Sequence, residues 1–173
     1  KVARYSEVGF DPTEKDERVV CNLWGGWPTT PKAGDCQILL ELLQWMCSLE
    51  SNSRDCYEWA IRWLAYPLQH HGAKMKTTLV FHGMQGAGKN IFFDAICRLY
   101  GDYGGTVDQL AVESQFNDWA SRKLFVVFDE VVARNELYVL KNRIKSLITG
   151  ETIRINPKTF KAWTETNHCN GVW

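Results

Sequence analysis

The sequence predicts an α/β fold with a mostly parallel sheet, preceded by a helical segment, and three observations support this prediction. An apolar, β-branched run over 77–82 leads into a glycine-rich loop that ends in Lys89. A second apolar run, 124–128, has no polar alternation, which is typical of a strand covered on both faces in a parallel sheet. Apolar residues at helical spacing follow both runs and also precede the first of them.

Residues 1–72 are predicted to form a lead-in segment and a helical collar. The first part is rich in Gly, Pro, Thr and charged residues, which favours an extended chain anchored by its tryptophans. Apolar residues recur at helical spacing after Asp35, which is placed to cap a helix that ends near Glu50. A second helix is predicted over 54–66, because Pro67 disfavours its continuation.

The remaining residues, 73–173, are predicted to form the core of the fold around a phosphate-binding loop. Its glycines let backbone N–H groups turn toward phosphate oxygens, and the helix that begins at about Gly88 adds its positive dipole end. Lys89 adds a mobile charge suited to β- and γ-phosphates. The pattern predicts an ATP site formed by Gly83, Met84, Gln85, Gly86, Ala87, Gly88, Lys89 and Asn90. The alternative is a glycine-rich turn without a ligand.

Asn90 stands where such a loop usually has Ser or Thr, whose hydroxyl holds Mg²⁺. An amide oxygen can also contact a hard cation, so we expect Asn90 to serve as a metal ligand. The second ligand is expected to be Asp129, at the carboxyl end of the run 124–128, where open α/β sheets place their ligands. Glu130 is suited to polarise an attacking water. The alternative is that both acids only end a strand and cap the next helix.

A third polar feature, Thr166-Asn167-His168, lies near the end of the sequence. If a strand next to the one that bears Asp129 ends here, Asn167 is placed to sense the γ-phosphate or to orient the attacking water. Asn is also common in ordinary turns, which is the alternative interpretation. The predicted catalytic residues are therefore Lys89, Glu130 and Asn167.

Taken in order, the segments 83–90, 124–130 and 166–168 resemble the A, B and C motifs of superfamily 3 helicases, which are AAA+ ATPases of phages, plasmids and viruses. The likeness is strongest to phage-type primase-helicases, in which a G-x-x-G-x-G-K-N loop is familiar. It extends over roughly residues 22–170 and so includes part of the lead-in. The resemblance implies a P-loop AAA+ core, Mg²⁺ and ATP, a homo-oligomeric ring such as a hexamer, and room for a primase domain in the same longer chain.

The segment 152–160 alternates apolar and polar residues around an Asn-Pro turn, which predicts a β-hairpin. In the resembled family, the hairpin before the third motif projects into the central channel of the ring and its lysine grips DNA. Lys158 matches that position, with Arg154 and Lys161 as helpers, and such contacts with phosphates are independent of sequence. The alternative is that Lys158 only solubilises an exposed turn.

The bulk properties of the chain exclude several other classes of protein. The formal net charge is zero, although basic residues are concentrated over 141–161. The six cysteines form no C-x-x-C pair, so a zinc site is not predicted. No apolar run approaches the ~18 residues of a membrane span, and we expect a soluble cytoplasmic protein, in the host cytoplasm if phage-encoded. Because the sequence begins at Lys1 and stops soon after the third motif, we interpret it as an internal part of a longer protein.

Together these patterns predict an ATP-dependent replicative DNA helicase that hydrolyses Mg²⁺-ATP and translocates on single-stranded or forked DNA. No arginine follows Asn167, so the arginine finger of ring ATPases is not identified, and we expect weak hydrolysis by this chain alone. Two alternatives stay open. A nucleotide-binding switch or assembly module without turnover is favoured by Asn90, and a P-loop kinase would leave the basic hairpin without a purpose.

Overall fold

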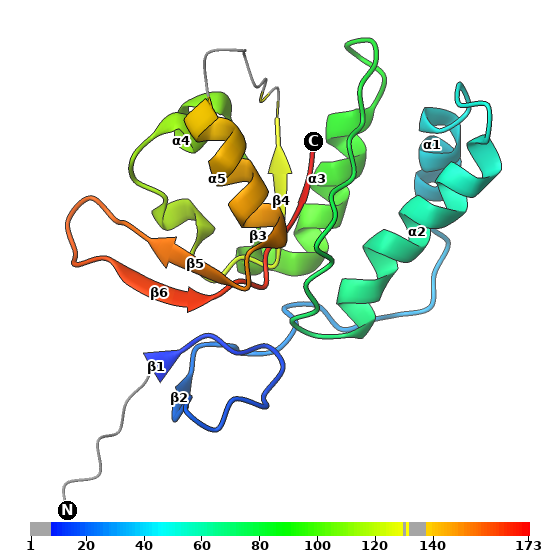
Figure 1. The fold of residues 1–173 in the computed structure, drawn as a ribbon. Coiled ribbons are helices and arrows are strands. Elements are labelled where there is room, and N and C mark those ends of the chain that lie inside the picture. The colour runs from blue at the N-terminus through cyan, green and yellow to red at the C-terminus, as the bar shows by residue number, and fades with distance from the viewer. Residues whose placement is uncertain (1–7, 130, 132–137) are drawn as a thin grey trace, which may run out of the picture.

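The computed structural model describes residues 8–129, 131 and 138–173. Two short strands and two helices come first, then helices and strands alternate from α3 to α5, and three strands end the chain (Figure 1). The helices are α1 (Gln37–Met46), α2 (Ser53–Gln69), α3 (Lys89–Tyr100), α4 (Gln109–Glu113) and α5 (Tyr138–Thr149), with 3-10 turns η1 (Gly101–Tyr103) and η2 (Asp118–Ala120). The strands are β1 (Val8–Gly9), β2 (Cys21–Asn22), β3 (Gly104–Val107), β4 (Phe125–Phe128), β5 (Thr152–Ile155), β6 (Trp163–Thr166) and β7 (Asn170–Val172).

The central sheet has three parallel strands in the order β3–β4–β7. All of β4 is buried, as its lack of polar alternation predicts. The strand expected over 77–82 is reduced to one parallel bridge between Leu79 and Val172, supported by the Trp173 N–H, which donates to the Leu79 carbonyl. Val80, the residue after Leu79, is 65% exposed, so one side of the segment 77–82 lacks packing. These observations confirm a mixed α/β fold with a small parallel sheet.

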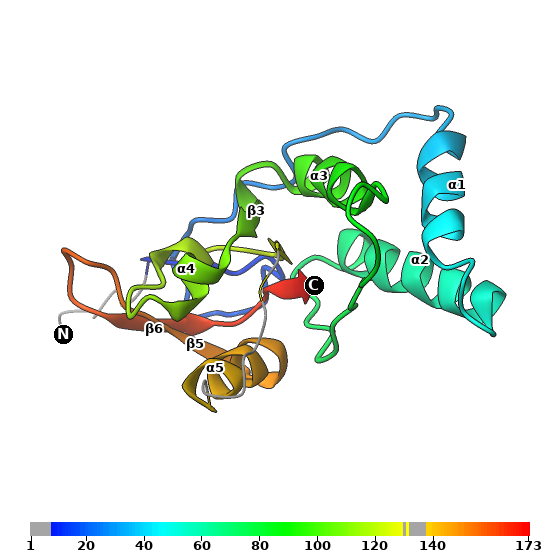
Figure 2. The ribbon, with the colours of Figure 1, turned by 90° about the horizontal axis from the view of Figure 1, so that it is seen from above.

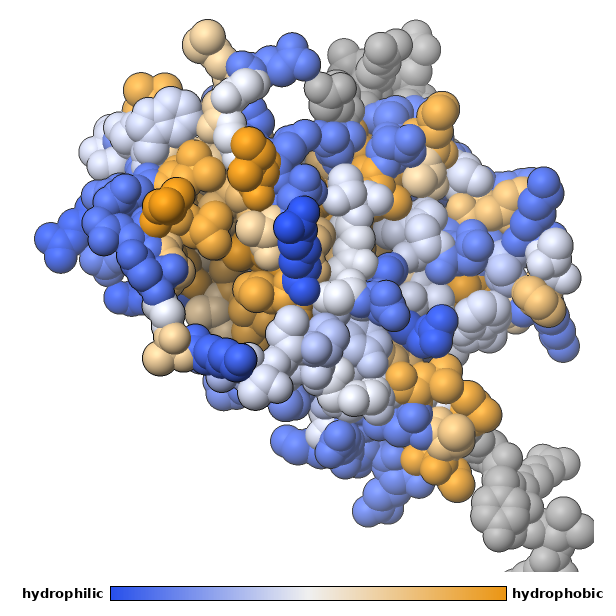
Figure 3. Space-filling model, turned by 180° about the vertical axis from the view of Figure 1, so that it is seen from behind, coloured by the Kyte–Doolittle hydropathy of each residue, from blue (hydrophilic) through white to orange (hydrophobic). Residues whose placement is uncertain are grey.

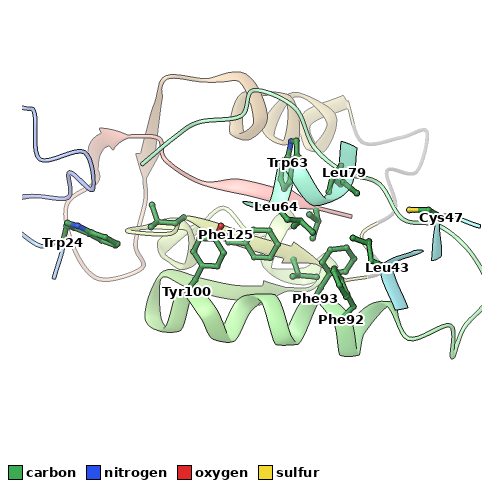
Figure 4. Packing of buried hydrophobic residues seen from close by; sticks show 14 of the residues in the cluster. Trp24, Leu43, Cys47, Trp63, Leu64, Leu79, Phe92, Phe93, Tyr100 and Phe125 are labelled. Atoms are coloured by element: carbon green, nitrogen blue, oxygen red, sulfur yellow. The ribbon is translucent and has the colours of Figure 1, made fainter. Parts of the chain in front are cut away.

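One cluster of buried side chains joins the sheet to the helices and to the lead-in (Figure 4). Tyr100 of α3 stacks on Phe125 of β4, with ring centroids 5.1 Å apart and planes 10° apart. Trp63 of α2 is buried, and its Nε1 donates to Thr77 Oγ1 at 2.9 Å. Each large apolar side chain buried in this way contributes roughly 1.5–3 kcal/mol. Because Trp24 of the lead-in belongs to the same cluster, the predicted lead-in and core share their packing, and the division at residue 72 stays a prediction.

The two helices expected in the first part of the chain are confirmed, with different ends. The observed N-cap of α1 is Cys36 rather than the predicted Asp35, whose carboxylate accepts a hydrogen bond from the Gln37 N–H at 2.8 Å. The helix ends at Met46 rather than near Glu50. Pro67 lies inside α2 instead of ending it. A proline in the last helical turn removes only one backbone hydrogen bond, and here its ring is buried, which offsets that loss.

The α1–α2 pair stands at one end of the molecule and presents apolar side chains to the outside (Figures 2 and 3). Ile38 is 81% exposed, and Trp45 and Trp59 are each 57% exposed. Exposed apolar groups in such number on one pair of helices are typical of a contact surface. Within the described ranges, no helix combines the length and the apolarity that a membrane span requires.

The predicted hairpin is present, but its second strand comes later than expected. β5 pairs antiparallel with β6, so that the connecting loop spans 156–162 rather than a tight Asn-Pro turn. The base of the loop is fixed by Asn117, whose Nδ2 donates to the Arg154 carbonyl at 2.8 Å and whose Oδ1 accepts from the Asn156 N–H at 2.7 Å. The hairpin therefore has an anchored base and an exposed tip (Figure 1).

Candidate phosphate-binding site

The glycine-rich loop lies at the carboxyl edge of the central sheet, between the Leu79 bridge and α3. Gly83 has a φ of 151°, and Gly86 and Gly88 each have a φ of 84°, a region that L side chains rarely adopt. A Cβ added at Gly83 or Gly86 would meet no atom within 4 Å. Backbone conformation rather than crowding therefore requires glycine at these two positions, and the space beside them is open.

The first turn of α3 has the charge distribution of an anion site. Its N-cap residue, Gly88, provides no side-chain cap, and no acidic residue lies in the first turn. The first N–H groups of a helix have no partner inside it and carry the positive end of the dipole. Lys89 adds a full positive charge at this end, which is electrostatically unfavourable unless an anion binds there. The Lys89 Nζ donates to the carbonyls of Gly83 and Met84, each at 3.1 Å, so within the part of the chain that the structure describes its hydrogen bonds stay inside its own loop.

The two predicted metal ligands lie together. Asn90 Nδ2 is 3.3 Å from each carboxylate oxygen of Asp129. Asp129 follows β4 directly, and its backbone N–H donates to the Val107 carbonyl at 2.9 Å, which fixes the carboxylate at the same edge as the loop. Amide and carboxylate oxygens are ligands that Mg²⁺ accepts, and rotation of the Asn90 amide would turn its oxygen toward the metal. The residues present therefore fit Mg²⁺ beside a bound polyphosphate.

Asn167 does not lie at this edge. β7 begins at Asn170, which pairs with Phe125, so Asn167 precedes the strand and lies at its amino end. At about 3.3 Å per residue, this places Asn167 roughly 20 Å along the sheet from Asp129. Its side chain is buried, donates to the carbonyls of Leu147 and Gly150, and accepts from the Cys169 N–H. The expectation of a γ-phosphate sensor fails because the strand starts after Asn167 instead of ending at it.

The remaining predicted residues divide into two groups. Glu130, the predicted catalytic base, lies outside the described residues. Arg154, Lys158 and Lys161 are exposed on the hairpin, on β5 and on its connecting loop. They are not part of the phosphate-binding loop. The structure therefore has two separate candidate regions, the loop with Asp129 and the basic hairpin.

The structure also brings together residues that the sequence did not indicate. Lys74 donates to the carbonyls of Leu147 and Cys169, and burial lowers the pKa of Lys74 to about 8. A cavity of about 480 Å³ lies between α4, α5 and β5. Its walls come from three segments that are separated in the chain, and no local pattern marks such a cavity.

Comparison with known proteins places this fold beside phage replication proteins. The chain is 34% identical over 115 residues to a DNA primase-polymerase of Nitratiruptor phage NrS-1, covering 65% of this chain and 16% of that protein. It also resembles two solved apo structures of the NrS-1 C-terminal region. One matches with a TM-score of 0.79 and 28% identity over 95% of this chain and 41% of that structure. The other matches with a TM-score of 0.72 and 29% identity over 84% and 35%. The chain thus spans less than half of each of these proteins.

A family model matches residues 81–172. The match begins just before the glycine-rich loop and ends in β7, so it includes the loop, the acidic strand and the hairpin. It covers more than half of the 173 residues. The protein therefore belongs to DUF5906, a family of unknown function.

Proposed function

We propose that this protein is the ATP-dependent motor of a DNA helicase of AAA+ type that acts in phage-type DNA replication. One observation carries the proposal: the uncapped first turn of α3 holds Lys89 inside a glycine-rich loop that faces the Asn90–Asp129 pair. An anion with an associated divalent cation balances all of these charges at once. A nucleoside triphosphate bound to Mg²⁺ meets that description.

Each residue of the loop would have a distinct task. The backbone N–H groups of 83–90 would hold phosphate oxygens, and Lys89 would exchange its two loop carbonyls for the β- and γ-phosphates. Asn90 and Asp129 would hold Mg²⁺. When bound, Mg²⁺ supplies positive charge against the charge that develops on the phosphate oxygens. Glu130 keeps its predicted role as the group that accepts a proton from the attacking water.

The DNA part of the proposal rests on the hairpin and on the relatives. Arg154, Lys158 and Lys161 would contact the phosphates of single-stranded or forked DNA, because Lys158 and Lys161 lie on the exposed loop and Arg154 is exposed on β5 at its anchored start. The relative from phage NrS-1 is named as a DNA primase-polymerase, which supports a role in replication and a primase domain elsewhere in the same longer chain. Nucleotide turnover at the loop would move the hairpin along the strand.

We extend the proposal to a homo-oligomeric ring, a hexamer in the resembled family. The exposed apolar side chains of α1 and α2 support self-association. Mass photometry should detect oligomers when Mg²⁺-ATP is present. Ile38→Asp should shift the population to monomers, whereas an unchanged distribution would remove α1 from the interface.

The decisive experiment measures ATP binding and phosphate release by the protein, with and without single-stranded DNA. Lys89→Ala should weaken ATP binding about 100-fold and abolish phosphate release, and Lys158→Ala should remove only the stimulation by DNA. ATP binding of unchanged affinity in Lys89→Ala would refute the loop as the nucleotide site. ATP consumption that depends on a small-molecule acceptor rather than on DNA would favour a kinase.

A nucleotide-binding switch without turnover is the second candidate, and the position of Asn167 favours it. A motor needs a polar group beside the γ-phosphate, and Asn167 is committed to structural bonds at the opposite edge. Asn90 in place of a hydroxyl residue points the same way. Tight binding of Mg²⁺-ATP by assembled protein, without phosphate release in the presence of DNA, would support the switch and exclude the motor.

A further inference from the structure

The cavity between α4, α5 and β5 has the features of a binding site separate from the phosphate-binding loop. In Figure 2, α4 and α5 lie on either side of the β5–β6 hairpin. The cavity is half-open and is lined by residues of these elements and of the segment that follows α4. Its volume of about 480 Å³ falls in the range of roughly 300–1,000 Å³ found for small-molecule sites. None of its lining residues belongs to the loop over 83–90.

The lining has an apolar interior and a positive rim. Val112, Trp119, Ile144, Leu147 and Ile153 supply the apolar part. Among the described lining residues, the ionisable side chains are Arg143 and Arg154, so the charge of the cavity has one sign. The side chains of Gln115 and Ser146 also line it and offer hydrogen-bonding groups at the rim.

The two arginines have fixed backbones and exposed side chains. Arg143 Nη1 donates to the carbonyls of Val112, Glu113 and Ser114, at 3.4, 3.2 and 2.7 Å, and so holds its guanidinium against the C-terminal end of α4. All three hydrogen bonds use the same guanidinium nitrogen, Nη1. Arg154 is exposed on β5, whose backbone is held by Asn117 at the edge of the cavity. One held guanidinium and one exposed guanidinium beside an apolar cavity suit an anion that carries a flat apolar body.

We propose that this cavity binds a nucleotide, with its base against the Trp119 side and its phosphate on Arg143 and Arg154. An aromatic base fits the apolar interior and can stack on an indole, while the phosphate matches the positive rim. The nucleotide is either free or part of a single strand that crosses the hairpin. For the strand-borne form the inference rests on the DNA binding proposed above, and for neither form does it depend on the ATP loop.

The experiment uses the protein with a short oligothymidylate that contains 4-thiothymidine, followed by ultraviolet crosslinking and mass spectrometry of the peptides. Crosslinks are expected in the peptides that contain Trp119 or Ile153. Competition by free dTMP would identify a mononucleotide site, and competition by oligonucleotides alone would identify a nucleotide within a strand. Crosslinks confined to the hairpin loop over 156–162 would overturn the proposal. Equal competition by a polyglutamate peptide would overturn it in favour of an acidic protein segment.

Two variants test the cavity without touching Arg143, whose loss would also disturb α4. Ser146→Trp should fill the cavity mouth and remove the crosslinks, and Arg154→Gln should weaken the affinity for the oligonucleotide about tenfold. Arg98→Gln on α3 removes the same charge away from the cavity and should have no effect. Thermal unfolding checks that each variant is folded. Unchanged crosslinks in a folded Ser146→Trp variant would overturn the proposal.

Lys89→Ala distinguishes this proposal from the proposed motor. The crosslinks should survive this substitution while ATP binding is lost. Loss of the crosslinks and of ATP binding together would mean that the oligonucleotide was held at the phosphate-binding loop, which would overturn the cavity site. If the unsubstituted protein forms the crosslinks but does not bind ATP, the proposed motor would be refuted and the cavity site would stand.

Discussion

The carboxyl edge and the amino edge of the central sheet each carry a lysine and an asparagine, but the hydrogen-bond partners of these residues differ between the two edges. At the carboxyl edge, Lys89 bonds to carbonyls five and six residues away, within its own loop. At the amino edge, Lys74 bonds to carbonyls 73 and 95 residues away, on α5 and before β7. A bond inside one loop can be exchanged for a ligand without unfolding, whereas bonds between distant segments are part of the fold. The range of its hydrogen bonds thus separates a lysine available for chemistry from a structural one.

The asparagines show the same difference. Asn167 and Asn170 tie the amino end of β7 to α5 and to the segment before the sheet, since Asn170 Nδ2 donates to the Ala73 carbonyl and its Oδ1 accepts from the Met75 N–H, each at 2.8 Å. Among the described residues, no buried side-chain polar atom lacks a partner. Asn90 is exposed, and its side-chain hydrogen bonds to described residues go to the Asp129 carboxylate. Burial with saturated hydrogen bonds therefore marks a structural asparagine.

The sharpest test of this comparison substitutes each of the two lysines in turn. Lys89→Ala should weaken the affinity for Mg²⁺-ATP by about 100-fold, or roughly 2.7 kcal/mol, because the phosphates lose their charged partner. Its free energy of unfolding should stay within about 0.5 kcal/mol of the original. Lys74→Met should do the reverse, with lower stability and unchanged affinity. Isothermal calorimetry and urea denaturation measure the two quantities, and a Lys89→Ala variant that unfolds would break the distinction.

A second test removes the asparagine that was predicted as catalytic. Asn167→Ala leaves the Gly150 carbonyl and the Cys169 N–H without the partner that Asn167 provides, while the Leu147 carbonyl keeps its bond from Lys74. Each such loss costs roughly 1–3 kcal/mol, so we expect the free energy of unfolding to fall by about 2 kcal/mol or more. Asn90→Ala is the matched control and should change stability by less than about 0.5 kcal/mol. A stable Asn167→Ala variant would return Asn167 to the list of functional candidates.

These results separate what the sequence predicts from what only the fold reveals. The loop over 83–90 and the strand at 125–128 were predictable, because glycine spacing and an unbroken apolar run are local patterns. The role of Asn167 was not, because it depends on β7 starting at Asn170, and a strand's starting point is set by its pairing with β4. The cavity beneath the hairpin was also hidden, since it needs α4, α5 and β5 to meet.

A third test uses pH at the amino edge. Burial lowers the pKa of Lys74 from 10.5 to about 8, so above pH 8 the folded state releases a proton that the unfolded state keeps. Stability should then rise with pH, by at most about 1 kcal/mol between pH 8 and 9. Above pH 9 the rise should level off, because burial raises the pKa of the Cys169 thiol from 9.0 to about 11. The unfolded thiol then ionises first, which offsets the contribution of Lys74.

Urea denaturation at several pH values between 7.5 and 10.5 measures this profile. Lys74→Met should remove the rise below pH 9, and Cys169→Ala should let the rise continue above it. The carboxyl edge provides the contrast, since Lys89→Ala should leave the profile in place. A rise that persists in Lys74→Met would show that another group is responsible and would weaken the structural role assigned to Lys74.

The smallest expected effect concerns the β5–β6 hairpin, which starts near the amino edge of the central sheet and ends in an exposed tip. Within the described part of the chain, the Lys158 ammonium has no hydrogen bond or ion pair, so its removal should cost no stability. Lys158→Ala should weaken the affinity for single-stranded DNA about threefold and reduce the slope of log affinity against log salt by about 0.7, since one phosphate contact is lost. Fluorescence anisotropy over a range of salt concentrations measures both.

Lys15→Ala removes an equal charge near the N-terminus and should leave the slope unchanged. An unchanged slope in Lys158→Ala would mean that the tip is only a solvated turn, and the two edges of the sheet would then contain one functional region instead of two.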